Sequence, residues 1–126
     1  MNIPKNLMYT KTHEWVEAVN DTTVRVGLTA YAAEQLGDLV FINLPEVGDE
    51  AVTEEVLCDV ESVKAVSDIY SPATGKITAV NEELMDAPQN VNAEPFTAWI
   101  AEIGDITEKI ELLNSDEYEK ILAEEA

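Results

Sequence analysis

The most restrictive feature of this sequence is a reversal of its side-chain alternation around residues 63 and 64. Apolar side chains occupy even positions before this point and odd positions after it. The positions concerned are Val56, Cys58, Val60, Ala65 and Ile69. A two-residue turn pairs even with odd positions on antiparallel strands. The reversal therefore predicts a tight hairpin whose turn consists of Val63 and Lys64.

Val63 and Lys64 are unusual residues for such a turn. Two-residue turns favour Asn, Asp and Gly, because these residues adopt positive φ at little cost. Lys64 is also the only basic residue in the fifty positions from 26 to 75, which contain ten carboxylates. A surface lysine that offsets nearby acids is the simpler interpretation, whereas the broken turn preference favours a functional one. No pocket would desolvate an ammonium at an exposed tip, so Lys64 suits modification or docking better than proton abstraction.

Alternating patterns and turn signals run along most of the remaining chain. They predict strands over 15–19, 23–28, 39–44, 55–61, 65–70, 75–80 and 97–103. Thr29 is expected to cap a short helix that ends at Gly37, and Ser115 to cap a C-terminal helix. Residues 81–94 are expected to form a loop with one helical turn at 82–85. We therefore predict a mainly β fold, a small antiparallel barrel or sandwich with short helices, forming a single domain over residues 1–126.

The charge balance limits the possible partners. Seven basic and 26 acidic residues give a net charge of −19, which disfavours binding to nucleic acids and anionic membranes. Partners with basic docking faces are expected instead. The single cysteine, Cys58, allows no internal disulfide, and the single histidine, His13, lacks the neighbours of a nucleophilic triad. We expect no catalytic residue and no metal site. Because we find no apolar leader or membrane span, we expect a cytoplasmic protein.

Two adjacent segments resemble the lipoyl-attachment region of the glycine cleavage system H protein family. They are residues 61–68, ESVKAVSD, and residues 70–75, YSPATG. Biotinyl and lipoyl carriers in general have a lysine at a hairpin tip and a glycine eleven residues later, a spacing that Lys64 and Gly75 match. The resemblance extends over almost the whole chain, through residues 9–16, 27–29, 36–41 and 44–48.

The resemblance implies a barrel-sandwich hybrid of two antiparallel sheets, with lipoic acid joined to Lys64 by an amide. Such a protein is a carrier rather than an enzyme. It would take an aminomethyl group from the pyridoxal-phosphate glycine decarboxylase (P protein) to the tetrahydrofolate-dependent aminomethyltransferase (T protein). A dihydrolipoyl dehydrogenase (L protein) would reoxidise the arm, and a lipoylating enzyme would attach it. The family also places Glu14 beside the parked arm, and a monomer is expected.

The resemblance has one clear departure near Trp99. Family members usually have a glycine directly before this tryptophan, within a Pro-Tyr-Gly-like loop. Here residues 95–99 read PFTAW and contain no glycine. Because Thr97 and Ala98 resist backbone angles that glycine adopts, we expect an altered loop at this point.

Other interpretations remain open at the level of sequence. A lipoate-relay protein that supplies lipoyl groups to other enzymes would use the same Lys64. A lipoyl domain of a 2-oxoacid dehydrogenase would lack both the segment 12–15, THEW, and the C-terminal helix. Biotin carriers favour methionine beside the lysine, unlike Val63 and Ala65. A hydrolytic enzyme that uses His13 and acidic residues requires that Lys64 is never modified.

Overall fold

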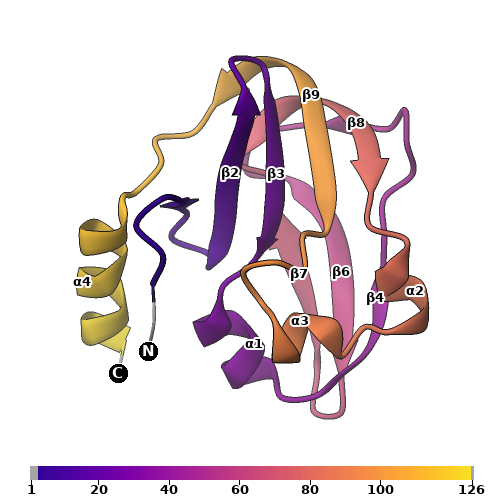
Figure 1. The fold of residues 1–126 in the computed structure, drawn as a ribbon, viewed down its shortest axis with the longest axis vertical. Helices are drawn as coiled ribbons and strands as arrows, with labels where there is room; N and C mark the ends of the chain where they lie inside the picture. Colours follow the sequence, from indigo (N-terminus) through magenta and orange to yellow (C-terminus); the bar gives the residue numbers. More distant parts are fainter. Residues whose placement is uncertain (1–2, 126) are drawn as a thin grey trace.

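The computed structural model describes residues 3–125, which form two antiparallel β-sheets, three short helices and a C-terminal helix (Figure 1). One sheet has six strands in the order β1-β2-β3-β9-β8-β5, and the other has three in the order β4-β6-β7. The strands are β1 (Met8–Tyr9), β2 (Glu14–Asn20), β3 (Thr23–Leu28), β4 (Leu39–Asn43), β5 (Glu50–Ala51), β6 (Val56–Ser62), β7 (Val66–Tyr70), β8 (Ala73–Val80) and β9 (Ala101–Lys109). The helices are α1 (Ala30–Leu36), α2 (Glu83–Asp86), α3 (Asn90–Ala93) and α4 (Ser115–Glu125). The expected mainly β fold of two antiparallel sheets is confirmed.

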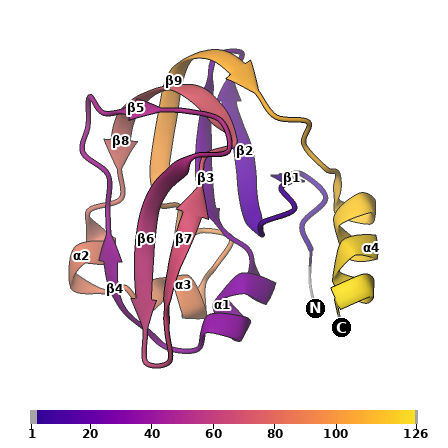
Figure 2. The same ribbon diagram turned by 180° about the vertical axis from the view of Figure 1, so that it is seen from behind.

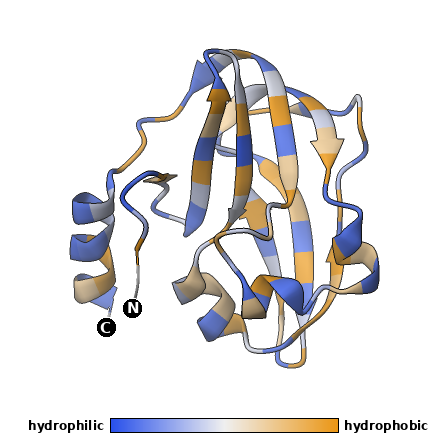
Figure 3. Cartoon of the chain, viewed as in Figure 1, coloured by the Kyte–Doolittle hydropathy of each residue, from blue (hydrophilic) through white to orange (hydrophobic). Residues whose placement is uncertain are grey.

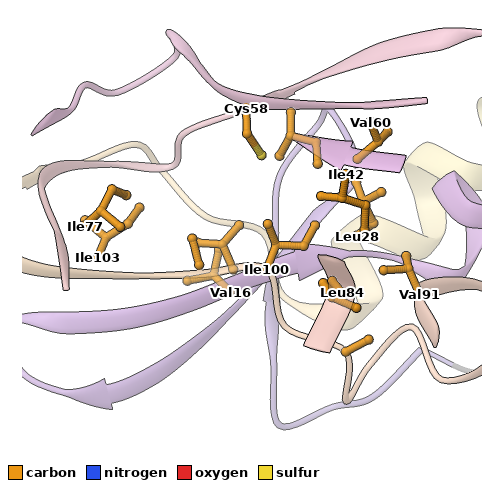
Figure 4. Packing of buried hydrophobic residues seen from close by; sticks show 14 of the residues in the cluster. Val16, Leu28, Ile42, Cys58, Val60, Ile77, Leu84, Val91, Ile100 and Ile103 are labelled. Carbon is orange, nitrogen blue, oxygen red and sulfur yellow. The ribbon is translucent and has the colours of Figure 1, made fainter. Parts of the chain in front are cut away.

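The main core lies between the two sheets. Apolar side chains from both sheets and from α2 and α3 pack together there with almost no exposure (Figure 4). The most deeply buried include Val26, Val60, Ile69, Ile77, Leu84, Val91, Ile100 and Ile103. Along β3, apolar and polar residues alternate, which Figure 3 shows as bands. Since one face of each strand is buried, this alternation also specifies the pairing register.

The hairpin predicted from the parity reversal is confirmed. The Ser62 amide donates to the Ala65 carbonyl at 2.8 Å, which leaves only residues 63–64 in the turn between β6 and β7. Cys58 faces the core, as its even position predicts. The expectation for Val56 is wrong, because the register shifts between Val56 and Cys58 and leaves the Val56 side chain exposed. A one-residue irregularity of this kind reverses the face of every residue beyond it.

Helix capping matches the prediction at α1 but not at α4. Thr29 caps α1, and its side chain accepts a hydrogen bond from the Ala32 amide. The residue that caps α4 is Asn114 rather than Ser115. The Asn114 side chain accepts from the Glu117 amide and the Glu117 carboxylate accepts from the Asn114 amide, both at 2.9 Å. This reciprocal capping box satisfies two free amides, which a lone serine cap cannot do.

Aromatic packing attaches α4 to the six-stranded sheet. Tyr118 of α4 stacks on Tyr9 with ring centroids 4.7 Å apart, and its hydroxyl oxygen lies 2.7 Å from Oγ1 of Thr29. Trp15 is buried in the same cluster. Although α4 is the longest helix, no helix in residues 3–125 is long and apolar enough to cross a membrane.

Two regions differ from the predicted elements. Residues 81–94 contain two short helices, α2 and α3, instead of a single helical turn. The strand expected over 97–103 begins at Ala101 and continues to Lys109, because pairing with β8 extends it through mostly polar positions. Strands β1 and β5 have two residues each, too few to produce a periodic pattern. Near Trp99, neither Thr97 nor Ala98 adopts positive φ, so the loop forms without the family glycine.

Candidate functional site

Lys64 lies exposed at the tip of the β6–β7 hairpin, the lowest point of the molecule in Figure 2. The Ser62 hydroxyl oxygen accepts hydrogen bonds from the amides of Lys64 and Ala65, at 3.1 and 3.0 Å, and the hydroxyl donates to the Ala65 carbonyl. Neither Val63 nor Lys64 adopts positive φ. A side chain therefore stabilises this turn in place of Asn or Gly, and the β-branched Val63 fits without backbone strain. Parity alone did not predict this role of Ser62, although a serine next to a turn is a recognisable signal.

The Lys64 side chain lies against the turn between α1 and β4. At Gly37 in this turn, an added Cβ would lie only 2.9 Å from Cε of Lys64. The backbone of Gly37 has φ 80° and ψ −166°, a combination accessible almost only to glycine. The Val63 amide donates to the Asp38 carbonyl at 3.0 Å. The hairpin tip and the lysine stem thus rest on one glycine-containing turn.

Asn92 of α3 holds this turn in place. Its side-chain nitrogen donates to the Gly37 carbonyl at 2.9 Å and more weakly to that of Ala33. Its side-chain oxygen accepts from the Leu39 amide at 2.9 Å. Nothing in the sequence pattern indicated this contribution, because α3 itself was not predicted and the contacts span more than fifty residues.

We expect Gly37→Ala to lower the free energy of unfolding by about 1–3 kcal/mol, because alanine is strained at these backbone angles. Its methyl group should also displace the Lys64 side chain. Gly48→Ala is a matched control, since Gly48 also has positive φ, 98°, but no atom within 4 Å of the added Cβ. Urea unfolding measures both costs.

A double-mutant cycle separates the two effects at Gly37. Shortening the lysine with Lys64→Ala removes the contact but leaves the backbone strain, so the cycle should show coupling between the two positions. We expect no such coupling between Gly48 and Lys64. Equal coupling at both glycines would contradict the assigned contact.

A cleft of about 530 Å³ lies at the opposite end of β7. Its lining includes Thr10, Thr12, Glu14, Glu54, Tyr70 and Glu111. Tyr70 is six residues from Lys64, a distance of about 20 Å along an extended strand. The structure therefore does not bring the two predicted site residues, Lys64 and Glu14, into contact. Only a long substituent on Lys64 could reach the cleft.

Glu14 is the one acidic residue among residues 3–125 that is fully buried, with 1% of its surface exposed. Its Oε1 accepts hydrogen bonds from the hydroxyls of Thr10 and Thr12, at 2.6 and 2.5 Å. Within the described part of the chain, Oε2 accepts only the Tyr70 amide, at 3.4 Å. Burial raises the pKa of Glu14, and these hydrogen bonds oppose the rise. A carboxylate with spare accepting capacity beside a cleft is suited to binding a cation.

Comparison with known proteins decides the family. Residues 7–125 match the family model described as Glycine cleavage H-protein. The chain belongs to this family. The glycine cleavage system H protein of Lachnoclostridium phytofermentans is 57% identical over 125 residues, which cover 99% of this chain and 98% of the relative. The probable glycine cleavage system H protein of Pyrococcus abyssi is 47% identical, over 95% of this chain and 92% of the relative.

A solved structure leads to the same family. The crystal structure of a glycine cleavage system H protein from Mycobacterium marinum matches with a TM-score of 0.90 and 41% sequence identity. The match covers 96% of this chain and 99% of that one. The resemblance predicted from sequence is therefore confirmed. Because the family match extends from residue 7 through most of α4, it also disfavours a bare lipoyl domain of a 2-oxoacid dehydrogenase.

The raised pKa of Glu14 has a consequence for stability in this family member. The folded carboxyl holds its proton more tightly than the unfolded one, whose pKa is near 4.5. The wild type should therefore lose stability as pH rises from about 4.5 through the folded pKa, by up to about 1.4 kcal/mol per pH unit. The glutamine in Glu14→Gln does not titrate, so the stability of this variant relative to the wild type should increase over the same pH range. Urea unfolding of both proteins from pH 4 to 8 measures the difference, and parallel stability curves would contradict it.

His13 and Cys58 have structural surroundings. Nδ1 of His13 lies 2.8 Å from the Tyr118 hydroxyl oxygen, and Nε2 lies 2.9 Å from a Glu125 carboxylate oxygen. The histidine thus joins the segment before β2 to α4, which supports a structural role over a catalytic one. Cys58 is buried in the core, where burial raises the pKa of its thiol to about 12. This thiol stays protonated and is a poor nucleophile.

Proposed function

We propose that this chain carries lipoic acid as an amide on Lys64 and works as the H-protein component of the glycine cleavage system. In this role it takes an aminomethyl group from glycine decarboxylase to aminomethyltransferase, and it is a carrier, not an enzyme. The observation that carries the proposal is the unstrained, exposed presentation of Lys64 at the tip of the β6–β7 hairpin.

The residues around Lys64 fit a covalently attached lipoyl group. The amine is open to an attaching enzyme, and the cleft at the far end of β7 offers space for a long arm. When bound, lipoic acid supplies a ring disulfide that accepts and releases the cargo. Amide formation removes the charge of Lys64. The aliphatic stem of Lys64 lies next to Gly37, where it does not depend on that charge.

Glu14 has a second part in the proposal. An aminomethyl cargo ends in an amine that is protonated near neutral pH, so it suits the carboxylate beside the cleft. Thr10 and Thr12 hold that carboxylate in place and favour its ionised form. Glu14 would therefore bind the loaded arm and release the empty one.

The net charge of −19 suits a carrier that visits several partners in turn. It would attract basic docking faces over a range set by the ionic strength. The proposed partners are the P, T and L proteins and the lipoylating enzyme. Our proposal includes a cytoplasmic monomer, because a small separate carrier can diffuse between these enzymes.

The proposal is tested by expressing the full chain with lipoate in a host that lipoylates proteins. Intact mass should increase by one lipoyl group, and peptide mapping should place the group on Lys64. The modified protein should then support glycine decarboxylation and aminomethyl transfer with purified P and T proteins. An unmodified mass would overturn the proposal. Lipoylation without aminomethyl transfer would instead favour the lipoate-relay function.

A further inference from the structure

Two consecutive apolar residues of β4 are exposed beside the hairpin tip. The pairing of β4 with β6 shifts register between Leu39 and Phe41. In a regular strand Val40 and Phe41 would face opposite sides, but this irregularity leaves both exposed, by 54% and 49%. Irregularities of this kind redirect side chains and are common next to functional sites.

The exposed apolar surface continues across the three-stranded sheet to the turn. Phe41 is opposite Glu61 on β6, and Glu61 is opposite Val66 on β7. Val63 of the turn and Val66 are both 66% exposed. Figure 2 shows β4, β6 and β7 side by side, with the turn at their lower end. We call Val40, Phe41, Val63 and Val66 the tip patch.

Carboxylates accompany the tip patch. Strands β4, β6 and β7 contain three acidic residues, Asp59, Glu61 and Asp68, and no basic residue. Asp59 and Asp68 are paired with each other across β6 and β7, two residue pairs away from the Glu61–Val66 pair. Within residues 3–125, none of the three forms an ion pair. The surface beside Lys64 is thus apolar at its centre and negative at its border.

We propose that the tip patch is the docking surface for the enzyme that acylates Lys64, and that this enzyme presents an apolar depression bordered by Lys or Arg. The inference rests on the proposed function. In acylation, Nζ of Lys64 loses a proton and forms a bond to the carboxyl carbon of a lipoyl mixed anhydride, whose leaving group departs with its electron pair. This chemistry requires the enzyme to surround the tip, so its surface must cover the neighbouring side chains. An apolar centre with a charged rim is the usual composition of a protein interface.

The tip patch and the presentation of Lys64 should affect different kinetic parameters of acylation. Docking contacts that are equally strong in the encounter complex and in the transition state change KM and leave kcat unchanged. Loss of correct lysine presentation would instead lower kcat. A change confined to KM therefore indicates a docking surface, and a fall in kcat indicates damage to the hairpin.

The first experiment compares two serine variants of the full chain. The test variant carries Val40→Ser with Phe41→Ser, and the control carries Val19→Ser on β2, where the valine is 48% exposed. A purified lipoate–protein ligase with lipoate and ATP is the probe, and intact mass follows acylation. We expect KM for the test variant to rise about tenfold or more, with kcat within about twofold of wild type. The control should match wild type.

A second experiment tests the charged border. Increasing salt from low to physiological concentration should raise KM for the wild type, because it screens the attraction between the two faces. Asp59→Asn with Asp68→Asn should raise KM at low salt and weaken this salt dependence. A melting curve would detect any loss of stability in the β4 double variant. The aspartate double variant tests the same surface without depending on the stability of that protein.

The outcomes separate this inference from the proposed function. If the wild type accepts lipoate but the β4 variant has an unchanged KM, the tip patch is not the docking surface. An equal rise of KM in the Val19→Ser control would overturn it as well. If the wild type itself accepts no lipoate on Lys64, it is the proposed function that fails.

Discussion

Replacing Lys64 with arginine is expected to abolish lipoyl attachment while leaving the fold intact. A guanidinium stays protonated at all physiological pH values, so it cannot form the amide. The aliphatic part of arginine can still lie against Gly37, and the side chain is exposed. The free energy of unfolding should therefore change by no more than about 0.5 kcal/mol. Intact mass after expression with lipoate and a thermal melt measure the two effects.

Lys76→Arg is the matched control for this prediction. Lys76 is exposed on β8, away from the hairpin tip, so Lys76→Arg makes the same chemical change outside the proposed attachment site. This variant should receive one lipoyl group, like the wild type. Lipoate on any other lysine of the Lys64→Arg protein would contradict the assignment of the attachment site. A large loss of melting temperature in that variant would show that Lys64 has a structural role.

The hairpin could be predicted from sequence because its information is local. Strand alternation has a period of two, and a two-residue turn must reverse its parity. The positions of Cys58, Val60 and Ile69 therefore located the turn, and the buried side chains agree. The cap of α1 was equally local, since Thr29 and Ala32 lie within one helical turn.

The rest of the site depends on contacts between distant residues. Gly37 could be read from sequence as a helix stop, but its contact with Lys64 depends on where the hairpin packs. Asn92 reaches that same turn from α3, whose four residues are too few to produce a helical pattern. The irregularity at Val40 interrupts the strand period on which the prediction relied. Glu14 came only from the family resemblance, because its burial and its threonine partners follow from tertiary packing.

The burial of Glu14 lowers the stability of the fold and therefore favours a functional role for this residue. A carboxylate taken out of water is destabilising unless it is fully hydrogen-bonded, and one of its oxygens accepts only a long hydrogen bond from Tyr70. Stability alone would favour a neutral or apolar side chain at this position. A cationic group entering the cleft would supply the missing donor and lower the pKa of the carboxyl. The incompletely hydrogen-bonded carboxylate and the proposed cationic cargo are thus complementary.

Glu14→Gln is expected to be lipoylated normally but to lose its aminomethyl cargo to water faster than the wild type. Glutamine keeps the shape and the acceptor for the Thr10 and Thr12 hydroxyls, while the charge is removed. A charge-assisted hydrogen bond of this kind contributes about 1.5–3 kcal/mol, which corresponds to roughly a tenfold to hundredfold change in the equilibrium constant between the bound and the free arm. The rate of formaldehyde release from the loaded protein measures the effect.

The other acidic residues that line the cleft provide the control. Glu54 and Glu111 are exposed, so water screens their charges and already satisfies their oxygens. Glu111→Gln should therefore release formaldehyde at nearly the wild-type rate. Lowering the pH should reduce the difference between wild type and Glu14→Gln, because protonation of Glu14 removes the same charge that the substitution removes. Equal release from wild type and Glu14→Gln at neutral pH would reject Glu14 as the binding residue, while lipoyl attachment to Lys64 would be unaffected, since the two groups are separated by the length of β7.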